Sequence, residues 1–149
     1  MAKNKKNNFG FTLIEILLVI ALMAVLAGLA VPIAWSFSTK NDLDVATGIF
    51  AQSLRRAENL AALGSNDSPW GVNLESQSVT IFEGASFASR DQSLDEVYNL
   101  PIAFTFSGPT EIVFNKFSGS PETTGSVVLT TSFNQSRTVS LNQLGLVSY

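Results

Sequence analysis

The sequence predicts an α+β fold in which a long N-terminal α-helix, transmembrane and then amphipathic, packs on an antiparallel β-sandwich or on small β-sheets. Three observations predict it. Residues 11–37 form an apolar run with one ionisable side chain, residues 38–64 continue with helical spacing, and residues 65–149 alternate as strands do. The length of 149 residues allows one domain of ordinary size.

The composition excludes several classes of function. Charged residues make up 14% of the chain and hydrophobic residues 46%, whereas an average protein has about 25% charged residues. The chain is therefore expected to be partly embedded in a membrane or to bury unusual surface. It has no Cys and no His, which excludes a disulfide framework, a Cys/His zinc site and a Ser/His or Cys/His catalytic pair. Its net charge of −3 argues against a nucleic-acid surface.

The apolar run has the length of a bilayer core. Residues 16–35 are 20 residues without a charged side chain, and as a helix they would span about 30 Å. Lys3, Lys5 and Lys6 precede the run. By the positive-inside rule these lysines place the N-terminus in the cytoplasm.

Three interpretations of the first 37 residues are open on these grounds. A secretory signal peptide could be cut after residues 28–30, but the run is long and Pro32 would lie beside the cut. A plain membrane anchor is the second. The third starts from Glu15, a carboxylate inside the apolar stretch, where it is costly unless paired. Thr12 and Glu15 also match a capping box, which would make Glu15 only a stabiliser of the first helical turn.

The residues around Glu15 resemble a known family. The segment reads Lys5-Lys6-Asn7-Asn8-Phe9-Gly10, then Phe11-Thr12-Leu13-Ile14-Glu15, then apolar residues 16–32. Over about residues 5–35 it is similar to the class III leader and N-terminal helix of type IV prepilins and type II secretion pseudopilins. The resemblance implies cleavage between Gly10 and Phe11 by prepilin peptidase and N-methylation of Phe11. It makes Glu15 the assembly contact, which neutralises the terminal amine of a neighbouring subunit. In lipid, such pairing would relieve two costly charges at once.

The resemblance implies a structural, non-enzymatic subunit, a minor pilin or pseudopilin of a type IV pilus or a type II secretion pseudopilus. The expected partners are other pilin or pseudopilin subunits, the prepilin peptidase, the assembly platform and the inner membrane. The chain would cross the bacterial inner membrane once, with its N-terminus in the cytoplasm, and then enter a periplasmic or extracellular filament. No cofactor and no metal are expected. The alternative is a secreted or membrane-anchored β-domain, an adhesin or binding module, with an ordinary signal or tether.

A weak point is expected inside the apolar helix. Pro32 has no N–H for the carbonyl four residues back, which belongs to Gly28. Relative to alanine, proline costs a helix about 3 kcal/mol and glycine about 1 kcal/mol. The turn from Gly28 to Pro32 is expected either to kink mildly or, as the resemblance implies, to act as a hinge that extends in a filament.

Amphipathic spacing continues beyond the apolar run. The apolar positions of this half are Leu43, Ala46, Phe50, Leu54, Ala57 and Leu60 or Ala61. They recur at steps of three and four, which predicts a buried helical stripe, and Gly64 is expected as the C-terminal cap. Arg55 and Arg56 are interpreted as a solvated helix face, with a contact to an acidic partner as the alternative.

The remainder predicts seven short strands. They are expected at residues 70–74, 79–82, 98–106, 112–114, 127–133, 138–141 and 146–149. Residues 134–137 predict a hairpin turn, and Pro101 should confine the third strand to an edge or split it. The polar segments 83–96 and 117–125 are expected as long loops. Together with the resemblance, these patterns divide the chain into a leader (1–10), a transmembrane and assembly helix (11–37), an amphipathic helix half (38–64) and a β-rich head (65–149).

The head also resembles a subgroup more weakly. Leu54-Arg55-Arg56-Ala57, Leu100-Pro101, Ile112-Val113-Phe114 and residues 138–147 are similar to H-type minor pseudopilins and their FimT-like pilus relatives. DNA-binding members carry arginines near the C-terminus, whereas residues 143–149 contain no basic side chain. DNA is therefore not expected as a partner.

Two groups of acidic residues are candidates for a catalytic or calcium site. Asp91, Asp95 and Glu96 lie in one polar segment, and Asp42 and Asp44 follow the apolar run. Neither group has the alternating spacing of a calcium loop. Both are therefore interpreted as solvated surface.

Overall fold

The structure is a computed structural model that describes residues 10–149, with the side chains of residues 29–37 outside the description. The chain divides into two compact units, of which the first ends at Ser38 and the second is Thr39–Tyr149. The α-helix α1 (Leu13–Ala62) contributes to both units, and the strands lie in the second, which we call the head. Apart from Gly10, the expected leader lies outside the described residues.

Helix α1 has nearly the predicted bounds. The sequence predicted one long helix over residues 11–37 and 38–64, and α1 covers Leu13–Ala62. It ends where Gly64 adopts a left-handed conformation with φ 64° and ψ 32°. The Gly64 N–H donates to the carbonyl of Ala61 at 2.9 Å. The prediction that Gly64 caps the helix is confirmed, because a left-handed residue that follows the last turn is a common helix stop.

Two four-stranded antiparallel sheets make up the rest of the head. The first has the order β3-β2-β1-β5, with β1 (Trp70–Glu75), β2 (Ser78–Glu83), β3 (Glu96–Asn99) and β5 (Glu111–Phe114). The second has the order β4-β6-β7-β8, with β4 (Thr105–Ser107), β6 (Gly125–Thr130), β7 (Ser136–Leu141) and β8 (Val147–Ser148). Short 3-10 turns are η1 (Ser65–Asp67), η2 (Phe87–Ser89) and η3 (Gln92–Leu94). The predicted α+β class with small antiparallel sheets is confirmed.

The predicted third strand, residues 98–106, is divided between the two sheets. Tyr98 of β3 pairs with Val79 of β2, whereas Phe106 of β4 pairs with Leu129 of β6. Pro101 lies between the two strands, and it has no N–H to donate to a sheet ladder. The described chain therefore has eight strands where seven were expected, and the segment expected as one strand links the two sheets.

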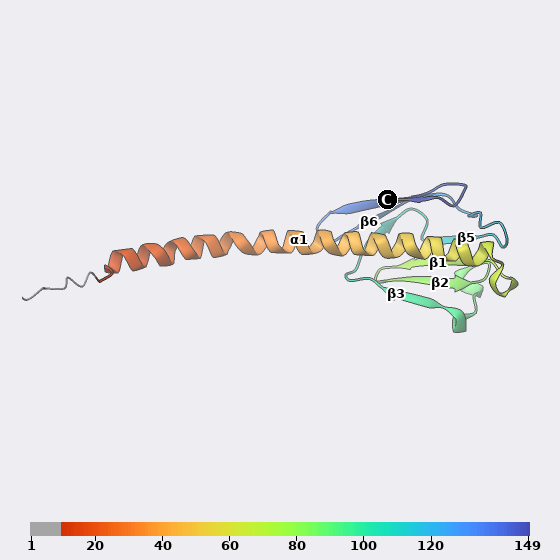
Figure 1. Ribbon diagram of the computed structural model, residues 1–149, viewed down its shortest axis with the longest axis horizontal. Coiled ribbons are helices and arrows are strands. Elements are labelled where there is room, and N and C mark those ends of the chain that lie inside the picture. Colours follow the sequence, from red (N-terminus) through yellow and green to blue (C-terminus); the bar gives the residue numbers. More distant parts are fainter. Residues whose placement is uncertain (1–9) are drawn as a thin grey trace, which may run out of the picture. The chain divides into compact units, whose positions relative to one another are not determined.

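The head-bound half of α1 buries its apolar stripe against both sheets. The stripe residues Leu43, Ala46, Phe50, Leu54, Ala57 and Ala61 are at most 1% exposed. They share one core with inward-facing residues of both sheets, among them Val72, Ile81, Phe114, Leu129 and Val139. Figure 1 shows β1, β2 and β3 on one side of this half of the helix and β6 on the other. Leu60 is only partly buried, so Ala61 is the residue that completes the stripe.

Candidate functional site

The N-terminal site residues lie where α1 begins. Gly10, Phe11 and Thr12 precede the helix, and the Phe11 side chain is 80% exposed. The hydroxyl of Thr12 accepts a hydrogen bond from the backbone N–H of Glu15 at 3.3 Å. Thr12 is therefore the helix N-cap that the capping box predicted. Among the described contacts, the return bond from the Thr12 N–H to the Glu15 carboxylate is absent, so the Glu15 side chain is not used by the cap.

The first part of α1 is apolar on all sides and uncovered. From residue 13 to residue 26, each of the eleven large apolar side chains is 43–82% exposed. Glu15 lies among them and is exposed as well. A helix that is hydrophobic around its whole circumference normally lies in lipid or against other helices. The described contacts of this segment thus leave its apolar surface available to something outside the chain.

Within the described residues, no helix combines the length and the apolarity that a membrane span requires.

The predicted hinge turn lies inside α1. Helical backbone continues through Gly28 and Pro32, and a Cβ added at Gly28 would meet no atom within 4 Å. The side chain of Pro32 lies outside the described residues. The hinge stays a prediction, because the extension was expected only within a filament. The predicted leader lysines Lys3, Lys5 and Lys6 also lie outside the described residues.

A groove runs along the exposed flank of α1 in the head. It has a volume of about 470 Å³ and is lined by Ile49, Gln52, Ser53, Arg55, Arg56, Asn59, Leu60, Leu63, Ile81 and Tyr98. Tyr98 lies opposite Val79 in the β2–β3 ladder, so the side chains of this pair share the face of the sheet that meets the helix. The groove is thus bounded by α1 on one side and by edge strand β3 on the other.

The two arginines of the groove have different surroundings. Arg56 forms two hydrogen bonds with the carboxylate of Glu96, at 2.5 and 2.6 Å, and Tyr98 donates its hydroxyl to the same carboxylate at 3.1 Å. The Arg56 bond holds the pKa of Glu96 below its usual value. Arg55 instead donates to the carbonyl of Val147 at 3.5 Å. Both arginines are exposed, as expected for a solvated helix face, but each also forms a hydrogen bond within the chain.

Burial disfavours the charged form of Glu58, a carboxylate on α1. Burial raises the pKa of Glu58, and the nearby Arg55 partly opposes that shift. Two loops close over Glu58, because a Cβ added at Gly119 or at Gly145 would contact its side chain. Both glycines have positive φ, 65° and 80°. The loops can therefore approach the helix closely.

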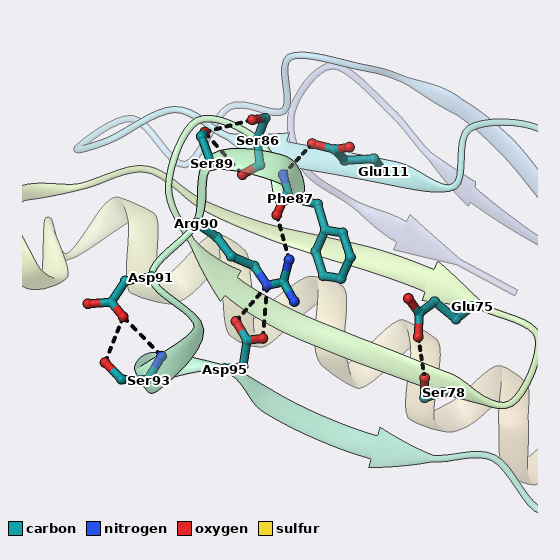
Figure 2. Close-up of polar contacts among 10 residues, drawn as sticks. All are labelled: Glu75, Ser78, Ser86, Phe87, Ser89, Arg90, Asp91, Ser93, Asp95 and Glu111. Carbon is teal, nitrogen blue, oxygen red and sulfur yellow. Dashed lines mark hydrogen bonds and ion pairs between the residues drawn. The ribbon is translucent and has the colours of Figure 1, made fainter.

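Hydrogen bonds hold the expected loop 83–96 together, as Figure 2 shows. We call the contacts of Arg90 with Asp95 and Phe87 the clamp. The Arg90 Nε donates to both carboxylate oxygens of Asp95 at 2.8 and 3.1 Å, and Nη1 donates to the Phe87 carbonyl at 2.6 Å. The guanidinium carbon lies 3.5 Å from the Phe87 ring centroid. The Phe87 N–H donates to Glu111 of β5 at 2.8 Å, which joins the loop to the sheet. Sequence reasoning missed this clamp, although an Arg and an Asp five residues apart in a Ser-rich loop were a possible signal.

The three acids grouped in the sequence have separate roles. Asp91 accepts hydrogen bonds from Ser93, and these bonds lower its pKa. Asp95 pairs with Arg90 and Glu96 with Arg56. Asp44, from the other acidic group, pairs with Arg137 at 2.9 Å. No cluster of three or more residues able to hold a metal ion occurs among the residues that the structure describes.

Comparison with protein-family models gave a match at the N-terminus. Residues 5–31 match the family model described as the prokaryotic N-terminal methylation motif. Neither the curated proteins nor the solved structures contain a match to this chain. The matched residues include Gly10, Phe11, Glu15 and Gly28, and the match ends before Pro32. Residues 5–31 of this chain therefore carry the class III prepilin leader motif, and this segment fits the N-terminus of a type IV pilin or pseudopilin.

Proposed function

We propose that this chain is a minor pilin or pseudopilin that prepilin peptidase cleaves between Gly10 and Phe11 and that assembles into a type IV pilus or type II secretion pseudopilus. The single observation that carries the proposal is the methylation motif at residues 5–31. It supports a type IV pilin-like or pseudopilin subunit. The motif belongs to structural rather than catalytic proteins, and we propose a structural role here.

The uncovered apolar segment supports assembly through the N-terminal helix. The eleven exposed apolar side chains between residues 13 and 26 need lipid before assembly and helices of neighbouring subunits after it. We propose that the inner membrane holds the segment first, with the N-terminus in the cytoplasm, and that the assembly platform transfers it to a periplasmic or extracellular filament. The run of residues 16–35 without charge supports this placement.

Cleavage changes the charges of the segment in a way that favours pairing. Loss of Lys3, Lys5 and Lys6 takes the formal side-chain charge from −3 to −6, and the cut creates a terminal amine on Phe11. The Thr12 cap leaves the Glu15 carboxylate free of the helix start. In the proposed filament this carboxylate accepts the Phe11 amine of a neighbour, so that neither charge stays unpaired in apolar surroundings.

The mature N-terminus tests the proposal. Intact mass and N-terminal sequencing of the chain from its native cell envelope should give N-methylated Phe11. A Gly10→Val variant should keep its leader, because a bulky side chain replaces hydrogen next to the cut. A mature chain that begins at Val31 would support the alternative, a secreted or anchored β-domain. Normal processing of Gly10→Val would reject the prepilin assignment.

A further inference from the structure

The head carries the triplet Asn-x-Ser at two places, and such a triplet can accept an N-linked glycan where x is not proline. The two triplets are residues 66–68 and residues 134–136. Both asparagines, Asn66 and Asn134, are exposed. Both also have a left-handed backbone, with φ 56° and 58°. The backbone and the exposure are therefore alike at the two places, and only the side-chain contacts distinguish them.

The side chains of the first triplet are held by contacts within the head. The Nδ2 of Asn66 donates to the carboxylate of Glu83 at 3.0 Å. Asp67 pairs with Lys116 at 2.8 Å. Both triplet residues belong to the turn η1, and Pro69 follows the triplet directly. The amide nitrogen that would have to bond to a sugar is thus already in use at this place.

The second triplet lies on the turn that joins β6 to β7, and its reactive groups are free. Among the contacts that the structure describes, neither the Asn134 amide nor the Ser136 hydroxyl forms a hydrogen bond. The backbone holds the turn instead. The Asn134 N–H donates to the carbonyl of Thr131 at 3.1 Å, and the Gln135 N–H donates to the Thr131 hydroxyl at 3.3 Å. The turn therefore keeps its shape without the two side-chain groups that the triplet offers.

The surroundings of Asn134 leave room for a bulky group. Ser132, Phe133, Ser136 and Arg137 are all exposed. The Phe133 ring, directly before the asparagine, is 69% exposed. A sugar attached to Asn134 could cover this ring, and such cover would remove apolar surface from water.

We propose that Asn134 is an N-glycosylation site, which receives a glycan from a lipid-linked sugar diphosphate after the head has left the cytoplasm. The Asn134 Nδ2 forms a bond to the anomeric carbon of the sugar, and the bond from that carbon to the diphosphate oxygen breaks. The lipid diphosphate leaves, and the amide proton passes to a base of the transferring enzyme. Because an amide nitrogen is a weak nucleophile, the transfer needs that enzyme, which reads the Ser136 hydroxyl two residues on.

This inference is independent of filament assembly. A pilin subunit and a secreted β-domain would both expose the head outside the cytoplasm, where the donor lipid presents its sugar. The modification can therefore be present or absent whichever of these two functions the chain has.

Peptide mapping of the full-length chain from its native cell envelope tests the site. Trypsin cuts after lysine and arginine, so the two triplets fall on separate peptides, residues 57–90 and residues 117–137. We expect peptide 117–137 to carry the added mass of at least one sugar, and fragmentation by electron transfer to place that mass on Asn134. Peptide 57–90 should have its unmodified mass.

Matched variants test how the triplet is read. Asn134→Asp removes the acceptor nitrogen and suits the left-handed turn, because Asp tolerates positive φ as Asn does. Asn134→Asp and Ser136→Ala should each abolish the added mass, whereas Ser136→Thr keeps the hydroxyl and should retain it. Ser68→Ala destroys the first triplet and is the control that should leave the modification unchanged. Equal resistance of the variants to protease shows that their heads are folded.

Several results would overturn the proposal. These are an unmodified peptide 117–137 from the native envelope, a sugar on a serine or threonine of that peptide, and added mass that survives Ser136→Ala. The proposed function is judged separately. N-methylated Phe11 with an unmodified Asn134 would reject the glycan and keep the pilin assignment. A glycan on Asn134 in a chain that begins at Val31 would keep the glycan and reject the pilin assignment.

Discussion

The first part of α1, residues 13–26, and its head-bound part, residues 39–62, differ in how their apolar surface is covered. Between residues 39 and 62 the apolar side chains form a stripe, and the chain's own two sheets bury it to 1% exposure or less. Between residues 13 and 26 the apolar side chains surround the helix, and every large one is at least 43% exposed. The head thus completes its own core, whereas the first part of the helix has no cover among the described residues, and we propose that lipid or neighbouring helices supply it.

The largest expected effect comes from shortening a buried side chain in the head-bound part of α1. Phe50→Ala should destabilise the head by about 3–5 kcal/mol, because Phe50 is fully buried and its loss leaves a cavity between both sheets. Leu18→Ala, a truncation in the uncovered part, should leave the unfolding of the head unchanged, since Leu18 is 65% exposed. Urea unfolding in detergent, followed by fluorescence of the buried Trp70, measures both. Equal losses of unfolding free energy in the two variants would contradict the distinction between a buried and an uncovered part of α1.

Two glycines sharpen the comparison. Gly108 has φ 114°, and a Cβ there would collide with the Ser126 carbonyl. Gly108→Ala should therefore lower the unfolding free energy of the head by about 1–3 kcal/mol.

A Cβ at Gly28 would meet no atom within 4 Å. Gly28→Ala should therefore stabilise the helical conformation of that turn by about 1 kcal/mol. Urea unfolding checks the first variant and circular dichroism in detergent micelles the second. A tolerated alanine at Gly108 would show that the link from β4 to β5 can shift.

The clamp on loop 83–96 is expected to have an intermediate effect. Asp95→Asn removes the carboxylate that accepts from Arg90, in a pair whose side chains are only 13–16% exposed. We expect a loss of about 1.5–3 kcal/mol, the range for a hydrogen bond to a charged group, and faster amide hydrogen exchange across the loop. Asp91→Asn is the matched control, because its Ser93 contacts are exposed. Unchanged exchange in Asp95→Asn would mean that the Phe87–Glu111 bond holds the loop alone.

The smallest effects concern pH. The folded-state pKa of Glu96 is lowered by Arg56, so its stabilisation is present above the unfolded-state pKa of about 4.3 and is lost as pH falls through the folded value. The folded-state pKa of Glu58 is raised by burial, so its stabilisation is complete below about 4.3 and is lost as pH rises. Glu96→Gln should flatten the acid side of the stability profile, and Glu58→Gln should raise stability at neutral pH. Urea midpoints measured from acid to neutral pH test both signs, and opposite slopes would contradict them.

The sequence predicted the elements whose signals are local. The steps of three and four residues from Leu43 to Ala61 specified the buried stripe, and Gly64 marked its end, because helix period and left-handed caps are encoded in neighbouring residues. The β1–β2 hairpin followed from alternation: Val72 pairs with Ile81 as two inward-facing residues. These features need no knowledge of distant contacts.

Features that depend on contacts between residues far apart in the sequence were missed or predicted only in part. Alternation from Tyr98 to Phe106 predicted one strand, but the choice of a separate partner sheet for each end depends on Val79 and Leu129, which lie far away in sequence. The Arg56–Glu96 pair joins residues 40 apart, and charge patterns along one helix could not assign it. At the N-terminus the motif residues Gly10, Phe11 and Glu15 were found in the sequence, while the assembly partner that we propose for Glu15 lies on another chain.

Incorporation of Glu15→Leu into filaments tests most directly the claim that the uncovered segment is completed by neighbouring subunits. Thr12→Ala is the matched control, because it removes the observed cap bond and keeps the carboxylate. We predict that both variants reach the membrane and are cleaved, that Thr12→Ala enters sheared filaments at nearly the natural level, and that Glu15→Leu is lost from them. The measurement scores this subunit itself in the filament fraction. Incorporation of Glu15→Leu at the natural level would contradict the account and leave Glu15 as a residue of the first helical turn only.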